Sequence, residues 1–355
     1  MLPLVIAAAC CTAPVLQLTH SPGPGVGFVP EYSKIQAFNA DGSRFLARGT
    51  DGSTILFDGR TLKRIGRLPI PEGDVEPRWR GSDRVVYLDG DRVREWSLAR
   101  RRARTLARFA GRGPLGSGAE QELPRSQRYY ALKSPDNVAF VVDLRTGRRG
   151  PLKRLRRAGD TLDYIAITPD GEHVMAMWAR HGAELYTRSW RHVRRLTTWD
   201  EHADFCRTAS GSDALVIAHY RAVPNDEVVE LVPLDGSPRR VLWRSPRFNL
   251  ALHISCRNTR QPGWAYLSSY WDGLGQRPAG GTPYENEIFA LRLDSTPARP
   301  VIRELARTGM KERADYFDEP HATVRQDGRL VLFASNQGRH VLDQSFANLF
   351  AVDLR

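Results

Sequence analysis

The chain has few of the residues that mark disulfide-rich, membrane-spanning or helical proteins. It contains four cysteines in 355 residues, too few for a disulfide-rich scaffold. Beyond the first residues, no apolar run approaches the roughly 20 residues that a transmembrane helix needs. Apolar residues at helical spacing are not sustained beyond a turn or two, which argues against a helical bundle. With 41% hydrophobic residues, the chain can nevertheless bury a full core.

The motifs of several common enzyme classes are also missing. The sequence has no glycine-rich phosphate loop between a strand and a helix, no Gly-x-Ser-x-Gly and no Cys-x-x-Cys. Two glycine-rich stretches occur, at 111–120 and 273–286, and they fit loop insertions because no helical pattern follows either of them. We therefore expect no organic cofactor.

Lysine is scarce, whereas arginine is abundant and the net charge is strongly positive. Lysine and arginine together number 52 against 40 acidic residues, which gives a net charge of +12. The folded surface should therefore attract anions. A GC-rich genome explains an arginine-rich composition equally well, so the charge does not identify the partner. The basic stretches 100–108 and 147–159 would suit nucleic acid, but we expect no nucleic acid because the N-terminus predicts export.

Residues 1–13 predict an export signal or a lipoprotein signal. The apolar run from Leu2 to Ala9 is too short to cross a bilayer as a helix. Its alanines suit signal-peptidase cleavage, and Ala-Ala-Ala-Cys10 also resembles a lipobox, in which the cysteine carries a lipid anchor. The run lacks a basic start and contains Pro3, so a mis-assigned start codon or a buried first strand is the alternative. We expect an exported protein that is periplasmic, anchored to the outer membrane or secreted.

We expect residues 14–355 to form one domain, in which the chain after Pro30 repeats a phrase of alternating apolar runs separated by tight turns. Clear copies begin at Lys34, Asp163 and His321, and weaker copies begin near Val75, Gln127, His202 and Leu252. The clear copies carry Asp-Gly pairs, at Gly42, Gly171 and Gly328, where a tight hairpin requires positive φ. About seven units at a period of about 40 to 50 residues are typical of propeller blades. We predict an all-β, monomeric, single-domain protein: a seven-bladed β-propeller of four-stranded antiparallel blades.

Two segments leave more than one structure open. Residues 98–109 are the best helical candidate, but their dense arginines and the absence of a cap favour an outer strand and a loop. The last repeat supplies three strands, one fewer than a blade needs. We expect an N-terminal segment, either 15–20 or 25–30, to supply the fourth strand, close the ring and remove its exposed edges.

Three histidines stand at matching places in successive repeats: His202, His253 and His321. The first strand of each propeller blade lines the central channel, so we expect the three side chains to converge at one mouth. Cys206 and Cys256 follow two of them at spacings that resemble zinc sites. We expect His253, Cys256 and His321 to hold one divalent metal: zinc, manganese or calcium. The alternatives are histidines that bond backbone carbonyls, and cysteines that form a disulfide or stay buried thiols.

Two resemblances bear on fold and function. The phrase TPDGEHVMAM at 168–177 and the ending PHATVRQDGRLVLFASNQG resemble TolB-type and WD40-like bacterial propellers, which implies the fold but not an activity. The phrases HADF, HISCRNTRQPGWAYLSS and EPHATVRQDGRLVLFASN resemble propeller-fold polysaccharide lyases of the oligogalacturonate and ulvan lyase type. This second resemblance implies β-elimination of a uronate polysaccharide, often with a divalent metal bound by histidines.

A lyase needs a base for the proton at C5 of the uronate and a cation for the carboxylate. We expect His202 to be the base and Arg257 to clamp the carboxylate, because a guanidinium suits a bidentate contact. Tyr270, or as second choice Tyr220, would protonate the leaving oxygen. The alternatives are an inter-blade salt bridge for Arg257 and a packing role for Tyr270. A second functional hypothesis is a non-catalytic TolB-like propeller that binds envelope proteins.

Overall fold

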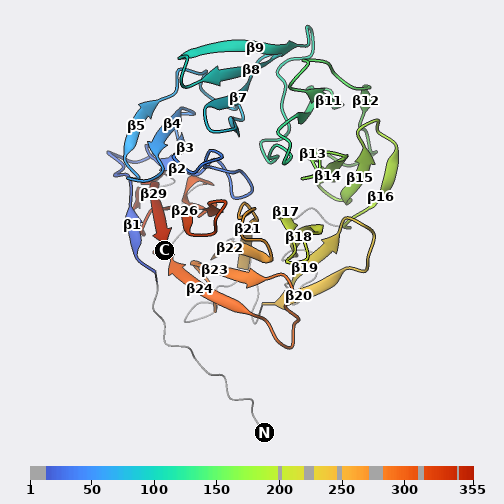
Figure 1. The fold of residues 1–355 in the computed structure, drawn as a ribbon. Helices are drawn as coiled ribbons and strands as arrows, with labels where there is room; N and C mark the ends of the chain where they lie inside the picture. Colours follow the sequence, from blue (N-terminus) through green and yellow to red (C-terminus); the bar gives the residue numbers. More distant parts are fainter. Residues whose placement is uncertain are drawn as a thin grey trace.

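The described chain forms a ring of seven antiparallel sheets around a central axis (Figure 1). The computed structural model describes residues 13–198, 202–219, 228–245, 250–271, 283–310, 316–341 and 344–355. Within these ranges the one helical element is a short 3₁₀ turn, η1 (Tyr316–Asp318). The prediction of an all-β, seven-bladed propeller is therefore confirmed.

The strands of each blade follow one another outward from the axis, beginning with the innermost strand. Blade 1 is β2 (Phe28–Val29), β3 (Arg44–Gly49), β4 (Thr54–Asp58) and β5 (Arg64–Arg67). Blade 2 is β6 (Arg78–Arg80), β7 (Arg84–Asp89), β8 (Arg92–Ser97) and β9 (Arg102–Arg108). Blade 3 is β10 (Tyr129–Lys133), β11 (Val138–Asp143) and β12 (Lys153–Arg154). Blade 4 is β13 (Leu162–Ile167), β14 (His173–Trp178), β15 (Gly182–Thr187) and β16 (His192–Arg195).

The remaining strands complete the ring and add one small hairpin. Blade 5 is β17 (Ala203–Arg207), β18 (Asp213–His219), β19 (Val228–Pro233) and β20 (Arg240–Arg244). Blade 6 is β21 (Leu250–Ser255), β22 (Trp264–Trp271), β23 (Glu287–Arg292) and β24 (Ile302–Arg307). Blade 7 is β25 (Thr323–Val324), β26 (Leu330–Ser335), β29 (Asn348–Asp353) and β1 (Val15–Gln17). The hairpin is β27 (His340–Val341) with β28 (Gln344–Ser345).

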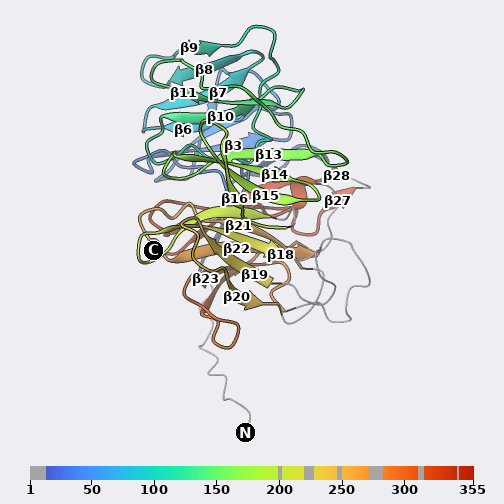
Figure 2. The ribbon, with the colours of Figure 1, turned by 90° about the vertical axis from the view of Figure 1, so that its right-hand side faces the viewer.

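Both ends of the chain build blade 7. Strand β1 pairs antiparallel with β29, with Val15 opposite Val352 and Gln17 opposite Phe350. The segment 15–20 therefore contains the closing strand, whereas the other candidate segment contributes β2 to blade 1. Figure 2, a view turned by 90°, places the C-terminus and the β27–β28 hairpin on opposite sides of the ring.

Local sequence explains several of these elements. Gly42, Gly171 and Gly328 have φ values of 70°, 80° and 70°, the left-handed conformation that the Asp-Gly turns require. Strand β9 occupies the arginine-rich segment, so the outer strand expected there is confirmed. Blade 3 has three strands, and Gly116 adds one isolated bridge to Lys133 of β10.

The hydrophobic core lies between neighbouring blades rather than in one central mass. Val216 of blade 5 packs in the same cluster as Ile254 of blade 6, and both side chains are almost completely buried. Ile288 of blade 6 and Val331 of blade 7 share another such cluster. Because each sheet is covered on both faces, its inner strands become continuous apolar runs. None of the helical residues that the structure describes forms a segment long and apolar enough to span a membrane.

Candidate metal centre

The three repeat histidines meet at the centre of the ring. His202 immediately precedes β17, His253 lies within β21, and His321 precedes β25, so they come from blades 5, 6 and 7. The imidazole centroid of His253 lies 4.4 Å from that of His202 and 4.4 Å from that of His321. The predicted convergence is thus present. The binding of a metal or a substrate by these residues stays a prediction.

Glu319, which the repeat pattern did not indicate, joins two of these histidines. Its Oε2 lies 3.3 Å from Nε2 of His253 and 3.3 Å from Nε2 of His321. One potential ligand atom from each of the three residues lies within 4.8 Å of the others, and all three residues are buried. The sequence signal for Glu319 was its place in the phrase Glu-Pro-His at 319–321. It was missed because, of these three residues, only the histidine matched the repeat.

The backbone at this centre departs from ordinary strand geometry. His321 has a φ of 41°, a left-handed conformation that costs a non-glycine residue roughly 1 kcal/mol or more. Such outliers concentrate at functional sites because the surrounding structure must hold them in place. The main-chain N–H of the next residue, Ala322, donates to the Ser268 hydroxyl at 3.1 Å, which fixes this turn against blade 6.

Burial and mutual repulsion favour the neutral forms of His202 and His253, while Glu319 stays charged. Burial, followed by the charge of His321, lowers the pKa of His253 to about 4. Burial and then the charge of His253 lower the pKa of His202 well below its usual range. Burial alone would raise the pKa of Glu319, but its contacts with His253 and His321 outweigh burial and hold that pKa well below the usual range. At neutral pH the centre therefore offers the neutral imidazoles of His202 and His253 and the carboxylate of Glu319.

These residues fit a divalent cation. Both ring nitrogens of His253 and Nε2 of His321 are buried without a hydrogen bond to any residue that the structure describes, and burying a polar nitrogen without such a bond is costly. A cation bound through one nitrogen of each imidazole and an oxygen of Glu319 would satisfy one of these nitrogens on each ring. Two histidines and a carboxylate suit zinc or manganese more than calcium, which prefers an all-oxygen shell.

Aromatic rings surround the histidines. Tyr32, which lies between β2 and β3 and was not predicted, has its ring centroid 4.9 Å from His321 and 5.5 Å from His253. The predicted residue Tyr270 lies 5.3 Å from His253 in a stacked arrangement and is only 3% exposed. Tyr316 contacts His321 at 4.6 Å and remains 46% exposed. Tyr316 therefore marks the side from which solvent reaches the cluster.

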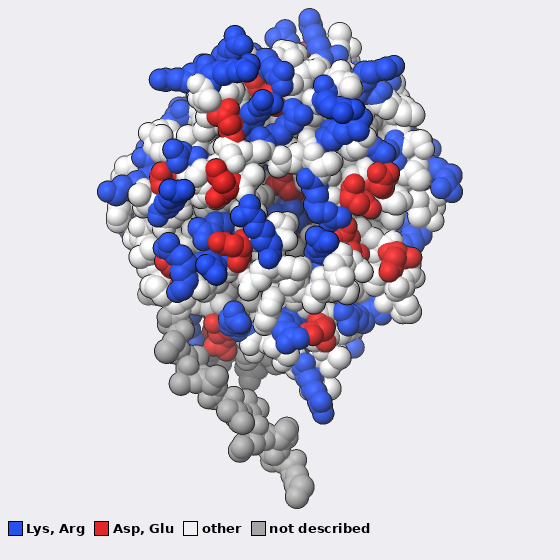
Figure 3. Space-filling view, in the orientation of Figure 1, with Lys and Arg blue, Asp and Glu red and all other residues white. Residues whose placement is uncertain are grey.

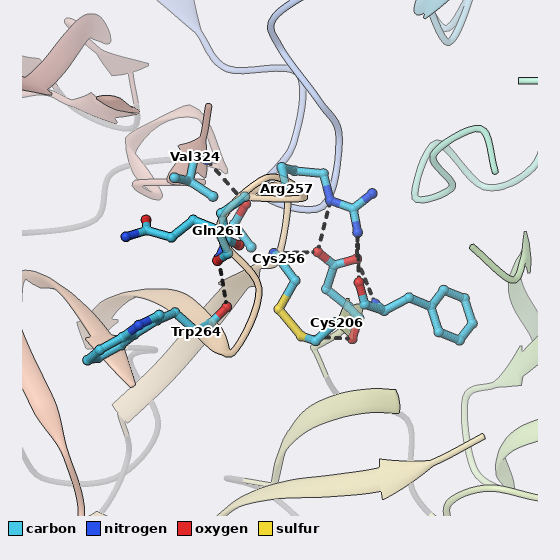
Figure 4. Close-up of a disulfide and its surroundings, with 10 residues drawn as sticks. Cys206, Cys256, Arg257, Gln261, Trp264 and Val324 are labelled. Atoms are coloured by element: carbon cyan, nitrogen blue, oxygen red, sulfur yellow. Dashed lines mark hydrogen bonds and ion pairs between the residues drawn. A yellow bond between two sulfur atoms is a disulfide. The ribbon is translucent and has the colours of Figure 1, made fainter. Parts of the chain in front are cut away.

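The prediction that Cys256 is a metal ligand is wrong. Cys256 forms a disulfide with Cys206, with a Cα–Cα distance of 4.9 Å (Figure 4). A sulfur in a disulfide has no thiolate to offer a metal. Of the three states left open for these cysteines, the structure contains the inter-blade disulfide, and Glu319 replaces Cys256 beside the two histidines.

The expected carboxylate clamp, Arg257, is already occupied. Its Nη2 donates to Oδ1 of Asp204 at 2.6 Å and to the Phe205 carbonyl at 3.0 Å. The Arg257 and Asp204 side chains are only 9% and 4% exposed, and the hydrogen bonds of Arg257 appear beside the disulfide in Figure 4. The geometry thus matches the alternative, an inter-blade salt bridge, because a paired guanidinium cannot also grip a uronate. Two further predictions, Tyr220 as acid and Cys10 as lipid anchor, lie outside the described residues.

Comparison with known proteins adds a fold-level result. No family model matches the chain, and no curated protein matches it. A solved oligogalacturonate lyase in complex with manganese superposes with a TM-score of 0.67 at 16% identity, covering 97% of this chain and 94% of that one. This chain therefore has the same β-propeller fold as that protein. The oligogalacturonate lyase from Vibrio parahaemolyticus gives a TM-score of 0.64 at 13% identity, covering 98% of this chain and 95% of the other.

A third neighbour is described as a β-propeller domain and not as a lyase. The β-propeller domain of Cps50 (Swd1) from Myceliophteria thermophila has a TM-score of 0.60 at 15% identity and covers 93% of this chain and 98% of its own. At these identities the likeness shows the fold alone, and the TolB/WD40-like and lyase-like resemblance predicted from the sequence is confirmed at that level.

Proposed function

We propose that the chain is an exported, metal-dependent polysaccharide lyase that acts on a uronate-containing polymer by β-elimination. The observation that carries this proposal is the pair of buried histidines, His253 and His321, whose unbonded nitrogens face Glu319 from two blades. The solved lyase with manganese supports it, because that neighbour joins the same fold to a metal and a uronate substrate class.

The metal, when bound, would polarise the uronate carboxylate and so acidify the proton at C5. Proton transfer then falls to residues of this chain. Nδ1 of His202 lies 3.0 Å from the Leu252 carbonyl; since a carbonyl oxygen only accepts, Nδ1 carries the hydrogen and Nε2 keeps a lone pair. The lowered pKa of His202 keeps this imidazole neutral at pH 7, as a base requires. Tyr270 beside His253 stays our candidate for the acid.

Lys34 places a buried positive charge near the histidines. Burial opposes its charge, but Glu120 and Tyr164 hold the pKa of Lys34 above its usual range. Its charge in turn acts on both His202 and His253 and lowers their pKa values further. Because Lys34 is paired with Glu120, it favours the neutral forms of these two imidazoles but does not take over the carboxylate contact that was predicted for Arg257.

The test combines metal content with activity. Protein purified without chelator should contain about one divalent metal per chain by elemental analysis. His253→Ala and Glu319→Gln should each lower metal content and lyase activity, read as ultraviolet absorbance of unsaturated uronate ends on oligogalacturonate and ulvan. His192→Ala, which changes an exposed histidine, is the matched control. A metal-free protein with no absorbance gain on any uronate polymer would overturn the proposal and favour the non-catalytic envelope scaffold.

Export is part of the same proposal and needs its own test. The disulfide between Cys206 and Cys256 supports it, because disulfides persist mainly in oxidising compartments. Cell fractionation, together with mass spectrometry of the mature N-terminus, should find the protein outside the cytoplasm and lacking residues 1–9 or a longer leader. A lipid on Cys10 would distinguish an anchored from a free protein. Recovery of the intact chain in the cytoplasm would contradict export.

A further inference from the structure

The channel contains a cavity on the side away from the histidines. It has a volume of about 360 Å³ and is lined by the carboxyl ends of inner strands and the turns that follow them. Figure 3 shows this face, with Lys and Arg side chains gathered around a central hollow. Its apolar walls include Phe38, Trp79, Leu123 and Phe205. None of the metal-centre residues lines it, so the cavity is a separate site.

Most of the charges that line this cavity neutralise one another. Lys34 pairs with Glu120 at 2.5 Å. Arg257 pairs with Asp204 at 2.6 Å. At the mouth, Arg125 holds Asp213 through two hydrogen bonds of 2.7 and 2.8 Å. These pairs build the walls and leave little charge for a ligand.

Three charged side chains in the lining have no ion pair with any residue that the structure describes. Inside the cavity, the hydrogen bonds that Glu122 accepts from the described residues come from the main-chain N–H groups of Gln36 and Leu123, each at 2.6 Å. At the mouth, Arg207 and Arg260 are exposed and donate to the backbone carbonyls of Gly211 and Ala40. Burial raises the pKa of Glu122, against the charges of Arg78 and Arg257, so a cation bound beside it would restore the interactions that it lost with water.

We propose that this cavity binds a small amino-carboxylate with an apolar body, such as a short peptide. Its ammonium group would pair with Glu122 inside, and its carboxylate would meet Arg207 and Arg260 at the mouth. The apolar body would lie against Trp79 and the neighbouring walls. Ligand pockets of a few hundred Å³ with apolar walls and a few polar groups typically hold small molecules in this way.

Calorimetry on the full-length protein tests both ends of the ligand. The probes are the dipeptide alanyl-phenylalanine, its N-acetyl form, which lacks the ammonium charge, and its C-terminal amide, which lacks the carboxylate. The free dipeptide should bind at least about tenfold more tightly than either blocked form, since a tenfold change corresponds to the loss of one modest charge contact. Equal affinity for all three forms, or no binding of any form, would overturn the proposal.

Variants assign each contact to its residue. Glu122→Gln, which keeps the side-chain shape and one acceptor oxygen, should weaken binding of the free dipeptide but not of the N-acetyl form. Replacing Arg207 and Arg260 together by alanine should weaken binding of the free dipeptide but not of its C-terminal amide. Arg145→Ala, at an exposed arginine outside the cavity, should change none of the affinities. A Glu122→Gln protein that binds the dipeptide as the parent does would refute the assigned contact.

The experiment is independent of the proposed lyase activity. Binding should persist in the presence of chelator and in the His253→Ala variant, because no metal-centre residue lines this cavity. Loss of lyase activity with intact dipeptide binding would therefore remove the function proposed above and leave this site standing.

Discussion

Asp204 organises several groups on the inner edge of blade 5. One carboxylate oxygen accepts from Nη2 of Arg257 at 2.6 Å, and the other accepts from the main-chain N–H of Cys256 at 2.7 Å. Burial raises the pKa of Asp204, while Arg257 and the Cys256 N–H oppose the rise. The carboxylate thus holds blade 6 to blade 5 through charge and through backbone, directly beside the disulfide.

Removing the charge of Asp204 alone should destabilise the protein strongly. Asp204→Asn leaves Arg257 buried without a counter-charge, and breaking a buried pair in this way costs about 3–5 kcal/mol. Equilibrium unfolding in urea should show this loss of unfolding free energy. The double variant Asp204→Asn with Arg257→Met should cost less than the sum of the two single changes, because it leaves no lone charge. Strictly additive losses would show that the pair does not couple the two blades.

At the scale of elements, two different links hold the ring together. The disulfide joins the end of β17 to the residue after β21, across 50 residues of sequence. Strand β1 joins the two chain ends through its pairing with β29. The disulfide stabilises the folded ring mainly by restricting the unfolded chain, whereas β1 does so through a ladder of hydrogen bonds in the folded state.

Replacing both Cys206 and Cys256 by alanine should lower stability by about 4 kcal/mol, the chain-entropy value for a loop of this length. The side chains are buried, so an additional small loss of packing is expected. The measurement is the unfolding midpoint of the double variant against the parent without reductant. With reductant present, the unfolding midpoint of the parent should approach that of the variant. If neither the double substitution nor the reductant lowers the midpoint, the disulfide does not have this role.

Removal of the closing strand should loosen the ring. A protein that begins at Leu18 lacks β1 and exposes the backbone edge of β29, which then invites pairing with other chains. We expect a lower melting temperature and concentration-dependent association by light scattering. A protein that begins at Ala13 retains β1 and is the control. An unchanged melting temperature on loss of Val15 to Gln17 would show that β29 does not need its partner.

The sequence predicted the elements better than the contacts. Asp-Gly pairs such as Asp41-Gly42 indicate a tight turn that needs a positive φ. The repetition of these turns along the sequence therefore showed where each blade lies. Matching positions also placed His253 and His321 at one centre. Glu319 and Tyr32 were missed because they stand outside the repeat, and their positions depend on how separate blades meet. Arg257 was assigned to substrate because nothing in its local sequence indicates the partner Asp204, 53 residues earlier.

At the scale of the whole molecule, carboxylates fall into two groups with opposite responses to pH. In exposed turns, hydrogen bonds from nearby serines, Ser43 for Asp41 and Ser134 for Asp136, lower the pKa below the ordinary 3.8. In the channel, burial raises the pKa of Glu120 and of Glu122 above the ordinary 4.5 despite nearby cations. These exposed turns therefore resist protonation, while Glu120 and Glu122 accept protons more readily; Glu319 and the neighbouring histidines, whose pKa values are lowered, do not share the response of Glu120 and Glu122.

These shifts predict opposing contributions to stability between neutral pH and about pH 5. The folded state binds protons on Glu120 and Glu122 before the unfolded state does, which raises the unfolding free energy. Over the same range the unfolded histidines take up protons before buried His202 and His253 do, which lowers it. Below about pH 4 the unfolded state takes up protons first, on residues such as Asp41, and the stability that they give is lost. Urea unfolding between pH 3 and 8 measures the curve. Glu122→Gln should reduce the gain in unfolding free energy towards about pH 5, and Asp41→Asn should reduce its loss below about pH 4. If each substitution instead changes the pH range expected for the other, this division between channel and turns is wrong.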